Sequence, residues 1–138
     1  QTIQTAIAKA KKLYPGLPLF AAGKSFGGRM TSQYLSANPD PGIKGLIFYG
    51  FPLHPPGKPS TERAEHLKAV KTPMLFLQGT KDELATWKLM EATCASLKLA
   101  TLVKITGANH AFKAGKQNIL QLLADTTKDW VGKMIKKG

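Results

Sequence analysis

The stretch Ala22-Gly23-Lys24-Ser25-Phe26-Gly27-Gly28 decides the fold. Its residues 23–27 match the pattern G-x-S-x-G. The pattern lies between an apolar run that predicts a strand and an amphipathic run that predicts a helix. A serine on so sharp a turn is held above the edge of a sheet with its hydroxyl exposed. We therefore predict that Ser25 is a nucleophile, and that Gly23 and Gly27 keep bulky side chains out of the turn.

Two other interpretations of this turn exist. Gly-Lys-Ser also ends a phosphate-binding P-loop, but that motif needs a glycine five positions before Gly23, where Pro18 stands. Alternatively, Ser25 only caps the helix that follows, and the sequence leaves this reading open. If Ser25 is a nucleophile, the N–H of Phe26 is expected to donate to an oxyanion formed in the reaction.

Short apolar runs alternate with longer amphipathic runs on both sides of this turn. The alternation predicts the α/β class, as a three-layer sandwich whose mainly parallel sheet of about four strands is flanked by helices. We expect one domain, residues 1–138. The predicted strands are residues 18–22, 45–49, 73–78 and 101–105. The predicted helices are residues 1–14, 26–37, 61–70, 83–97 and 115–136, and the proline-rich segment 51–60 is expected to be irregular.

An acid and a base follow the last two predicted strands. Asp82 and His110 each lie a few residues past a strand end, and the carboxyl ends of parallel strands meet at one edge of the sheet. The chain order Ser, Asp, His is also the order expected of a fold that carries its nucleophile on this kind of turn. We predict that His110 accepts the proton of Ser25 and that Asp82 orients the imidazole. Glu83 is a weaker candidate acid.

The remaining reactive residue types carry weaker signals. His54 lies in the proline-rich loop, which should form the lip of the cleft, so we consider it a candidate substrate contact. His66 is expected to be a solvated helix residue, and Cys94 a buried apolar one. No group of His, Cys, Asp and Glu has metal-ligand spacing, so we predict no metal site.

Composition limits the partners of the chain. Among its 138 residues, 43% are hydrophobic, but no apolar run reaches the roughly 20 residues that a membrane span needs. The single cysteine and the polar start of the chain favour a cytoplasmic location. The net charge is +12. Because the lysines are spread along the chain without an arginine-rich arm, the pattern argues against nucleic acid as a partner.

The chain resembles the α/β-hydrolase superfamily, and within it the small dienelactone-hydrolase-like branch of alpha/beta family hydrolases with testis-expressed, NSL-complex-subunit-like relatives. The resemblance rests on Ala-Gly-Lys-Ser-Phe-Gly-Gly-Arg-Met at residues 22–30, His-Pro-Pro-Gly-Lys-Pro at residues 54–59 and Gln-Gly-Thr-Lys-Asp at residues 78–82. It implies a serine hydrolase that cleaves a small carboxylic ester or a related acyl bond through an acyl-enzyme. The implied triad is Ser25, Asp82 and His110, with no cofactor. The alternative is a catalytically weak, hydrolase-like binding or scaffold protein.

Hydrolases of this kind have more strands than the four expected here. The missing part would include the loop that donates a second N–H to the oxyanion, and the loss of one such donor costs about 10²–10³ in rate. The strand before Ser25 would then lie at an uncovered edge of the sheet, and such edges pair readily with other strands. We therefore expect a homodimer in which a partner chain covers this edge.

Overall fold

A computed structural model describes residues 2–115 and 118–137. Its centre is a parallel sheet of four strands in the order β1-β2-β3-β4. The strands are β1 (Leu19–Lys24), β2 (Ile43–Tyr49), β3 (Met74–Gly79) and β4 (Ala100–Ile105). The helices are α1 (Ile3–Leu13), α2 (Phe26–Ala37), the 3-10 helix η1 (Glu62–Ala69), α3 (Trp87–Ala95) and α4 (Ile119–Lys137). The predicted α/β class with a four-stranded parallel sheet is confirmed.

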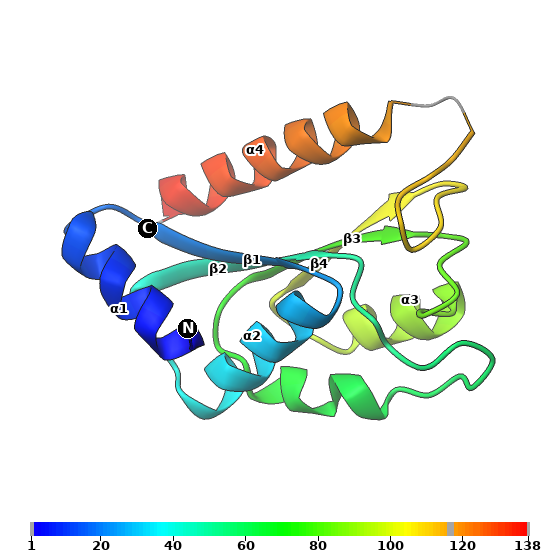
Figure 1. Ribbon diagram of the computed structural model, residues 1–138, viewed down its shortest axis with the longest axis horizontal. Coiled ribbons are helices and arrows are strands. Elements are labelled where there is room, and N and C mark those ends of the chain that lie inside the picture. Colours follow the sequence, from blue (N-terminus) through cyan, green and yellow to red (C-terminus); the bar gives the residue numbers. More distant parts are fainter. Residues whose placement is uncertain (1, 116–117, 138) are drawn as a thin grey trace.

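Helices cover both faces of the sheet (Figure 1). Helices α1, α2, α3 and η1 lie on one face, and α4 lies on the other. The alternation along β3 shows how the two cores divide: Met74 and Phe76 join the core under α2 and α3, while Leu75 and Leu77 join the core under α4. Because β3 is buried on both faces, its sequence is a nearly continuous apolar run.

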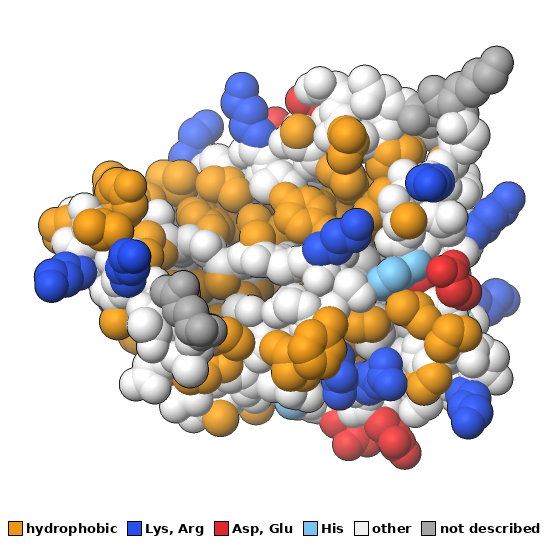
Figure 2. All heavy atoms as spheres, in the orientation of Figure 1, with side chains coloured by type: hydrophobic (Ala, Val, Ile, Leu, Met, Phe, Trp, Pro, Cys, Tyr) orange, Lys and Arg blue, Asp and Glu red, His pale blue; other side chains and the backbone are white. Residues whose placement is uncertain are grey.

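The strand that leads to Ser25 lies at an edge of the sheet. β1 pairs with β2 along one side only, in the part of the chain that the structure describes. Hydrophobic side chains gather along this side, between α1 and α4 (Figure 2). Helix α1 runs beside them and contributes no buried residue. The homodimer that we expect at this edge stays a prediction. None of the helices formed by the described residues is long and apolar enough to cross a membrane.

Two predicted helices begin later than the sequence pattern indicates. Helix α3 starts at Trp87 and not at residue 83. In a helix from residue 83 the N–H of Thr86 would donate to the Asp82 carbonyl, but it donates to the ring of His54 instead. Helix α4 starts at Ile119 and not at residue 115. The predicted helices 1–14 and 115–136 also include residues 1 and 116–117, which lie outside the described part.

The turn after β1 has a backbone that glycine makes possible. A Cβ on Gly23 would lie 2.3 Å from the backbone nitrogen of Gly28, so only a glycine fits there. A Cβ on Gly28 would in turn lie 2.9 Å from the carbonyl oxygen of Gly23. A Cβ on Gly27 would meet no described atom within 4 Å. The role that we predicted for Gly27 therefore belongs to Gly28, the residue where α2 approaches the end of β1.

Ser25 has strained backbone angles, φ 52° and ψ −121°. Such a conformation costs on the order of 1–3 kcal/mol and persists only where other contacts hold it. The N–H of Ser25 donates to the carbonyl of Tyr49 in β2, and its carbonyl accepts the N–H of Arg29 in α2. The strand and the helix thus hold the turn from both sides.

A pair of substitutions tests this packing. Gly23→Ala should destabilise the fold by at least about 3 kcal/mol, because its methyl group would overlap the backbone of α2. Gly27→Ala should change stability by less than about 1 kcal/mol, because its methyl group points into open space and alanine suits a helix. Urea denaturation of both variants measures the difference. Equal stability of the two variants would contradict the close approach of Gly23 and Gly28.

Cys94 provides a second test of the core. It is 6% exposed in α3, and burial raises the pKa of its thiol to about 12. The thiol should therefore stay protonated at neutral pH and react at least about 100-fold more slowly with a disulfide reagent than it does in the urea-unfolded chain. Absorbance after mixing with such a reagent measures both rates, and rapid stoichiometric labelling of the native chain would show that Cys94 is accessible.

Candidate active site

The side chain of Ser25 bonds across the molecule and does not cap its own helix. Ser25 occupies the N-cap position of α2 but makes no side-chain capping bond. Its Oγ lies 2.8 Å from Nε2 of His110. The interpretation of Ser25 as a simple helix cap is therefore wrong.

His110 connects Ser25 to a buried carboxylate. Nδ1 of His110 lies 2.8 Å from Oδ2 of Asp82, and the two side chains are 17% and 1% exposed. An ionised carboxylate can only accept, so Nδ1–H donates to it, and in the neutral ring Nε2 is left as an acceptor for the hydroxyl of Ser25. Glu83, the other candidate acid, is exposed and lies outside this chain of hydrogen bonds.

Close packing between the loops after β3 and β4 brings Asp82 and His110 together. A Cβ on Gly79 would lie 2.2 Å from the carbonyl oxygen of Ala108, so glycine allows the two loops to touch. The N–H of Lys81 donates to that same carbonyl over 2.9 Å. The N–H of Gly107 donates to Oγ1 of Thr80 over 2.8 Å. The two loops therefore form one unit that carries the acid and the base.

The backbone on either side of His110 is held by hydrogen bonds within its own loop. Oδ1 of Asn109 accepts the N–H groups of Ala111 and Lys113, both over 3.0 Å. On another side the ring packs on Gly50, where a Cβ would lie 3.5 Å from the ring atoms Cε1 and Nδ1. The loop is therefore ordered around His110, and Gly50 borders one side of its ring.

Sequence reasoning missed the residue that supports Asp82 from inside. Gln78 is fully buried, and its Nε2 donates to Oδ2 of Asp82 over 2.8 Å. Oδ1 of Asp82 accepts the N–H of Leu84, also over 2.8 Å. A signal was present in the strand pattern: Met74, Phe76 and Gln78 alternate on one face of β3, where an apolar residue would be expected at position 78.

Phe26 is the first residue of α2, and the donation of its N–H to an oxyanion stays a prediction. An N–H in the first turn of a helix has no acceptor within that helix, and the helix dipole makes this end partly positive. The side chain of Phe26 is 62% exposed. The backbone can therefore offer a donor beside the hydroxyl of Ser25.

His54 does not reach the expected cleft. It is 2% exposed, and both ring nitrogens have partners within the protein. Nε2 accepts the N–H of Thr86 and lies 2.8 Å from its Oγ1, while Nδ1 donates to the carbonyl of Pro55. These contacts connect the loop after β2 to the start of α3. A structural role therefore replaces the substrate contact that we predicted for His54.

A second Ser–His pair provides an internal comparison. Oγ of Ser32 lies 2.7 Å from Nε2 of His66, but Ser32 is fully buried. His66 is half-buried and not solvated as we expected; burial, and secondarily the positive charge of Arg29, lower the pKa of its imidazole. No carboxylate among the described residues bonds this ring. The pair lacks both access and an acid, and it differs in these respects from Ser25 and His110.

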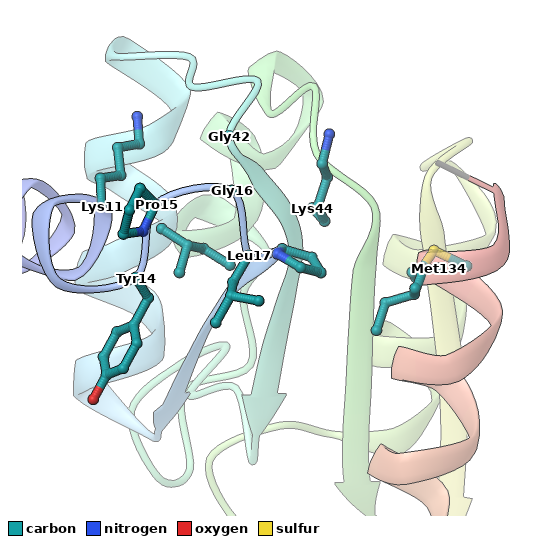
Figure 3. A pocket seen from close by; sticks show the side chains of 11 residues that line it. Lys11, Tyr14, Pro15, Gly16, Leu17, Gly42, Lys44 and Met134 are labelled. Atoms are coloured by element: carbon teal, nitrogen blue, oxygen red, sulfur yellow. The ribbon is translucent and has the colours of Figure 1, made fainter.

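An apolar pocket lies at the amino-terminal ends of β1 and β2, away from Ser25. It encloses about 390 Å³ between the turn after α1, the start of β2 and the end of α4 (Figure 3). Leu17, Lys44 and Met134 line it. These residues lie near the amino ends of the strands, whereas Ser25 follows a carboxyl end. No group of three or more metal-ligating side chains occurs within the described residues.

Comparisons with solved structures show the same fold at low sequence identity. Est1E from Butyrivibrio proteoclasticus matches with a TM-score of 0.73 and 20% identity, over 97% of this chain and 68% of that one. A monoacylglycerol lipase from Paleococcus ferrophilus matches with 0.73 and 15%, over 95% and 74%. An alpha-beta serine hydrolase homologue from Coxiella burnetii matches with 0.63 and 19%, over 78% and 48%. The chain thus spans about half to three quarters of the length of these structures.

Residues 1–134 match the family model described as "Alpha/beta hydrolase domain". This match covers nearly the whole chain and agrees with the sheet order and with the turn at Ser25. The narrower branch suggested by the sequence resemblance stays a prediction. The chain belongs to the alpha/beta hydrolase domain family.

Proposed function

We propose that this chain is a serine hydrolase that cleaves a carboxylic ester, or a related acyl bond, through an acyl-enzyme. One observation carries the proposal: hydrogen bonds of 2.8 Å each join Ser25 to His110 and His110 to Asp82. A nucleophile, a base and an orienting acid in this order are the arrangement that acyl transfer requires.

The proposed reaction has two halves, formation of the acyl-enzyme and its hydrolysis, and each group of the site has one role in each half. Oγ of Ser25 attacks the carbonyl carbon of the ester while its proton passes to Nε2 of His110, and the N–H of Phe26 donates to the oxyanion. The intermediate collapses, and the alcohol leaves with the proton from His110. Water then attacks the acyl-enzyme by the same route and releases the acid. Asp82 remains ionised and stabilises the imidazolium in both halves.

Family membership and one neighbour's name support an ester as the bond that is cleaved. The family is one of hydrolases, and one solved structure of the same fold is described as a monoacylglycerol lipase. Its identity of 15% makes the substrate class a proposal for this chain. The second candidate function, a catalytically weak scaffold of the same fold, differs in a measurable property, the reactivity of Ser25.

Substitution of the two serines that bond a histidine tests the nucleophile. Ser25→Ala should lower kcat for a chromogenic short-chain ester by at least about 10³, because it removes the hydroxyl that bonds His110 and forms the acyl-enzyme. Ser32→Ala is the matched control, since it removes a hydroxyl that also bonds an imidazole but is fully buried. It should retain the rate of the unchanged chain within about twofold. A loss of less than about tenfold in Ser25→Ala would rule out nucleophilic catalysis by this residue.

Covalent labelling separates an enzyme from a scaffold. A fluorophosphonate probe should label the chain once, at Ser25, because the hydroxyl is activated by His110. Labelling should disappear in both Ser25→Ala and His110→Ala. Intact-mass spectrometry measures the adduct. A folded chain that gains no mass after prolonged exposure would favour the scaffold.

A further inference from the structure

Gln78 is a polar residue in a position that packing alone would assign to an apolar one. It is the fifth residue of β3, on the same face as Met74 and Phe76, and is 0% exposed. A buried carboxamide without partners costs roughly 1–3 kcal/mol, so its hydrogen bonds must compensate for its burial.

The surroundings of Gln78 permit one orientation of its amide. Oε1 accepts the N–H of Phe51 over 2.9 Å. Nε2 donates to Oδ2 of Asp82 over 2.8 Å and faces the carbonyl of Phe51 at 3.4 Å. A flipped amide would place oxygen against a carboxylate and a carbonyl, two groups that only accept. The donor of Gln78 is therefore directed at Asp82.

This donor selects one rotation of the Asp82 carboxylate. Oδ1 is fixed by the N–H of Leu84, and Oδ2 receives both Gln78 and His110. Without Gln78, Oδ2 would be held only by His110 itself, and no contact independent of the imidazole would fix the rotation of the carboxylate about its bond to Leu84. The Nδ1–H of His110 would then lose a partner held at a constant angle.

The same side chain also fixes the surface on which the ring of His110 packs. Gln78 holds the N–H of Phe51, which follows Gly50 directly in the chain. Gly50 has a positive φ of 76°, and a Cβ there would lie 3.5 Å from two ring atoms of His110. One carboxamide thus connects the acid of the site and the backbone that borders the imidazole.

We propose that Gln78 is a positioning residue, which orients the Asp82 carboxylate toward His110 and holds the backbone at Gly50 and Phe51 against the imidazole. Its effect on hydrolysis rests on the function proposed above. Its effect on the contact between His110 and Asp82 does not, and this separates the two proposals experimentally.

The first test observes that contact directly. The Nδ1–H of His110 should give a low-field proton NMR signal in the full chain, absent in Asp82→Ala. In Gln78→Met, which keeps the length of the side chain but has no amide, the signal should move or disappear. Met74→Ala is the matched control: it removes buried side chain from the same face of β3 and should leave the signal in place. An unchanged signal in folded Gln78→Met, or no signal in the unchanged chain, would overturn the proposal.

The second test measures whether Gln78 acts through Asp82. Gln78→Met should lower kcat for an ester on the order of tenfold to a hundredfold, with KM within about threefold, because the substrate is not touched. In the Asp82→Ala background the same substitution should cost less than about twofold. An equal loss in both backgrounds would overturn the proposal. A chain without any ester turnover would refute the proposed function and leave the NMR test to decide on Gln78.

A second variant, Gln78→Glu, tests the same proposal if Gln78→Met fails to fold. Gln78→Glu keeps the shape of the side chain and an oxygen for the N–H of Phe51. It replaces the NH2 group that faces Asp82 with a second carboxyl oxygen, which repels the Asp82 carboxylate when it is ionised. It should displace the same NMR signal, and its loss of kcat should likewise shrink to less than about twofold in the Asp82→Ala background. A signal and a kcat equal to those of the unchanged chain would overturn the proposal.

Discussion

The Asp82 carboxylate is 1% exposed, in a place where an unpaired charge would cost several kcal/mol. Three donors meet it: the imidazole of His110, the amide of Gln78 and the N–H of Leu84. Each comes from a different place in the chain, so the carboxylate joins the loop after β4, the end of β3 and the segment before α3. Removing this charge would deprive one fully buried donor, Gln78, and two part-buried donors of this acceptor, and the loops of the site would lose their common anchor.

The strained turn at Ser25 depends on a different constraint, the approach of two backbones. Gly23 and Gly28 touch without side chains, which lets α2 start immediately above the end of β1. The hydrogen bond from the N–H of Ser25 to β2 then holds the backbone at its positive φ. The nucleophile is therefore placed by the sheet and the helix together, while the acid and the base are placed by loops tied to each other. The three side chains meet because both arrangements lie at the carboxyl edge of the same sheet.

The two Ser–His pairs of this protein show that a hydrogen bond between a serine and a histidine does not by itself make an active site. Ser32 and His66 are as close as Ser25 and His110, at 2.7 Å and 2.8 Å. The first pair is buried between α2 and η1 and has no carboxylate behind its imidazole, so its bond serves packing. The second pair lies beside a helix N-terminus and is backed by Asp82. Access, an acid and a nearby N–H donor distinguish a candidate active site from an ordinary buried hydrogen bond.

The sequence by itself determined the alternation of strands and helices, the turn at Ser25 and the strand ends that carry Asp82 and His110. These features follow from local patterns: the period of apolar residues, the positions of glycine and proline, and the common direction of parallel strands. The tertiary structure alone decided that Gly28 and not Gly27 is required, that His54 is buried, that α3 begins at Trp87 and that Gln78 faces Asp82. Each of these depends on a contact between segments distant in the chain, and no local pattern specifies which segments approach or at what distance.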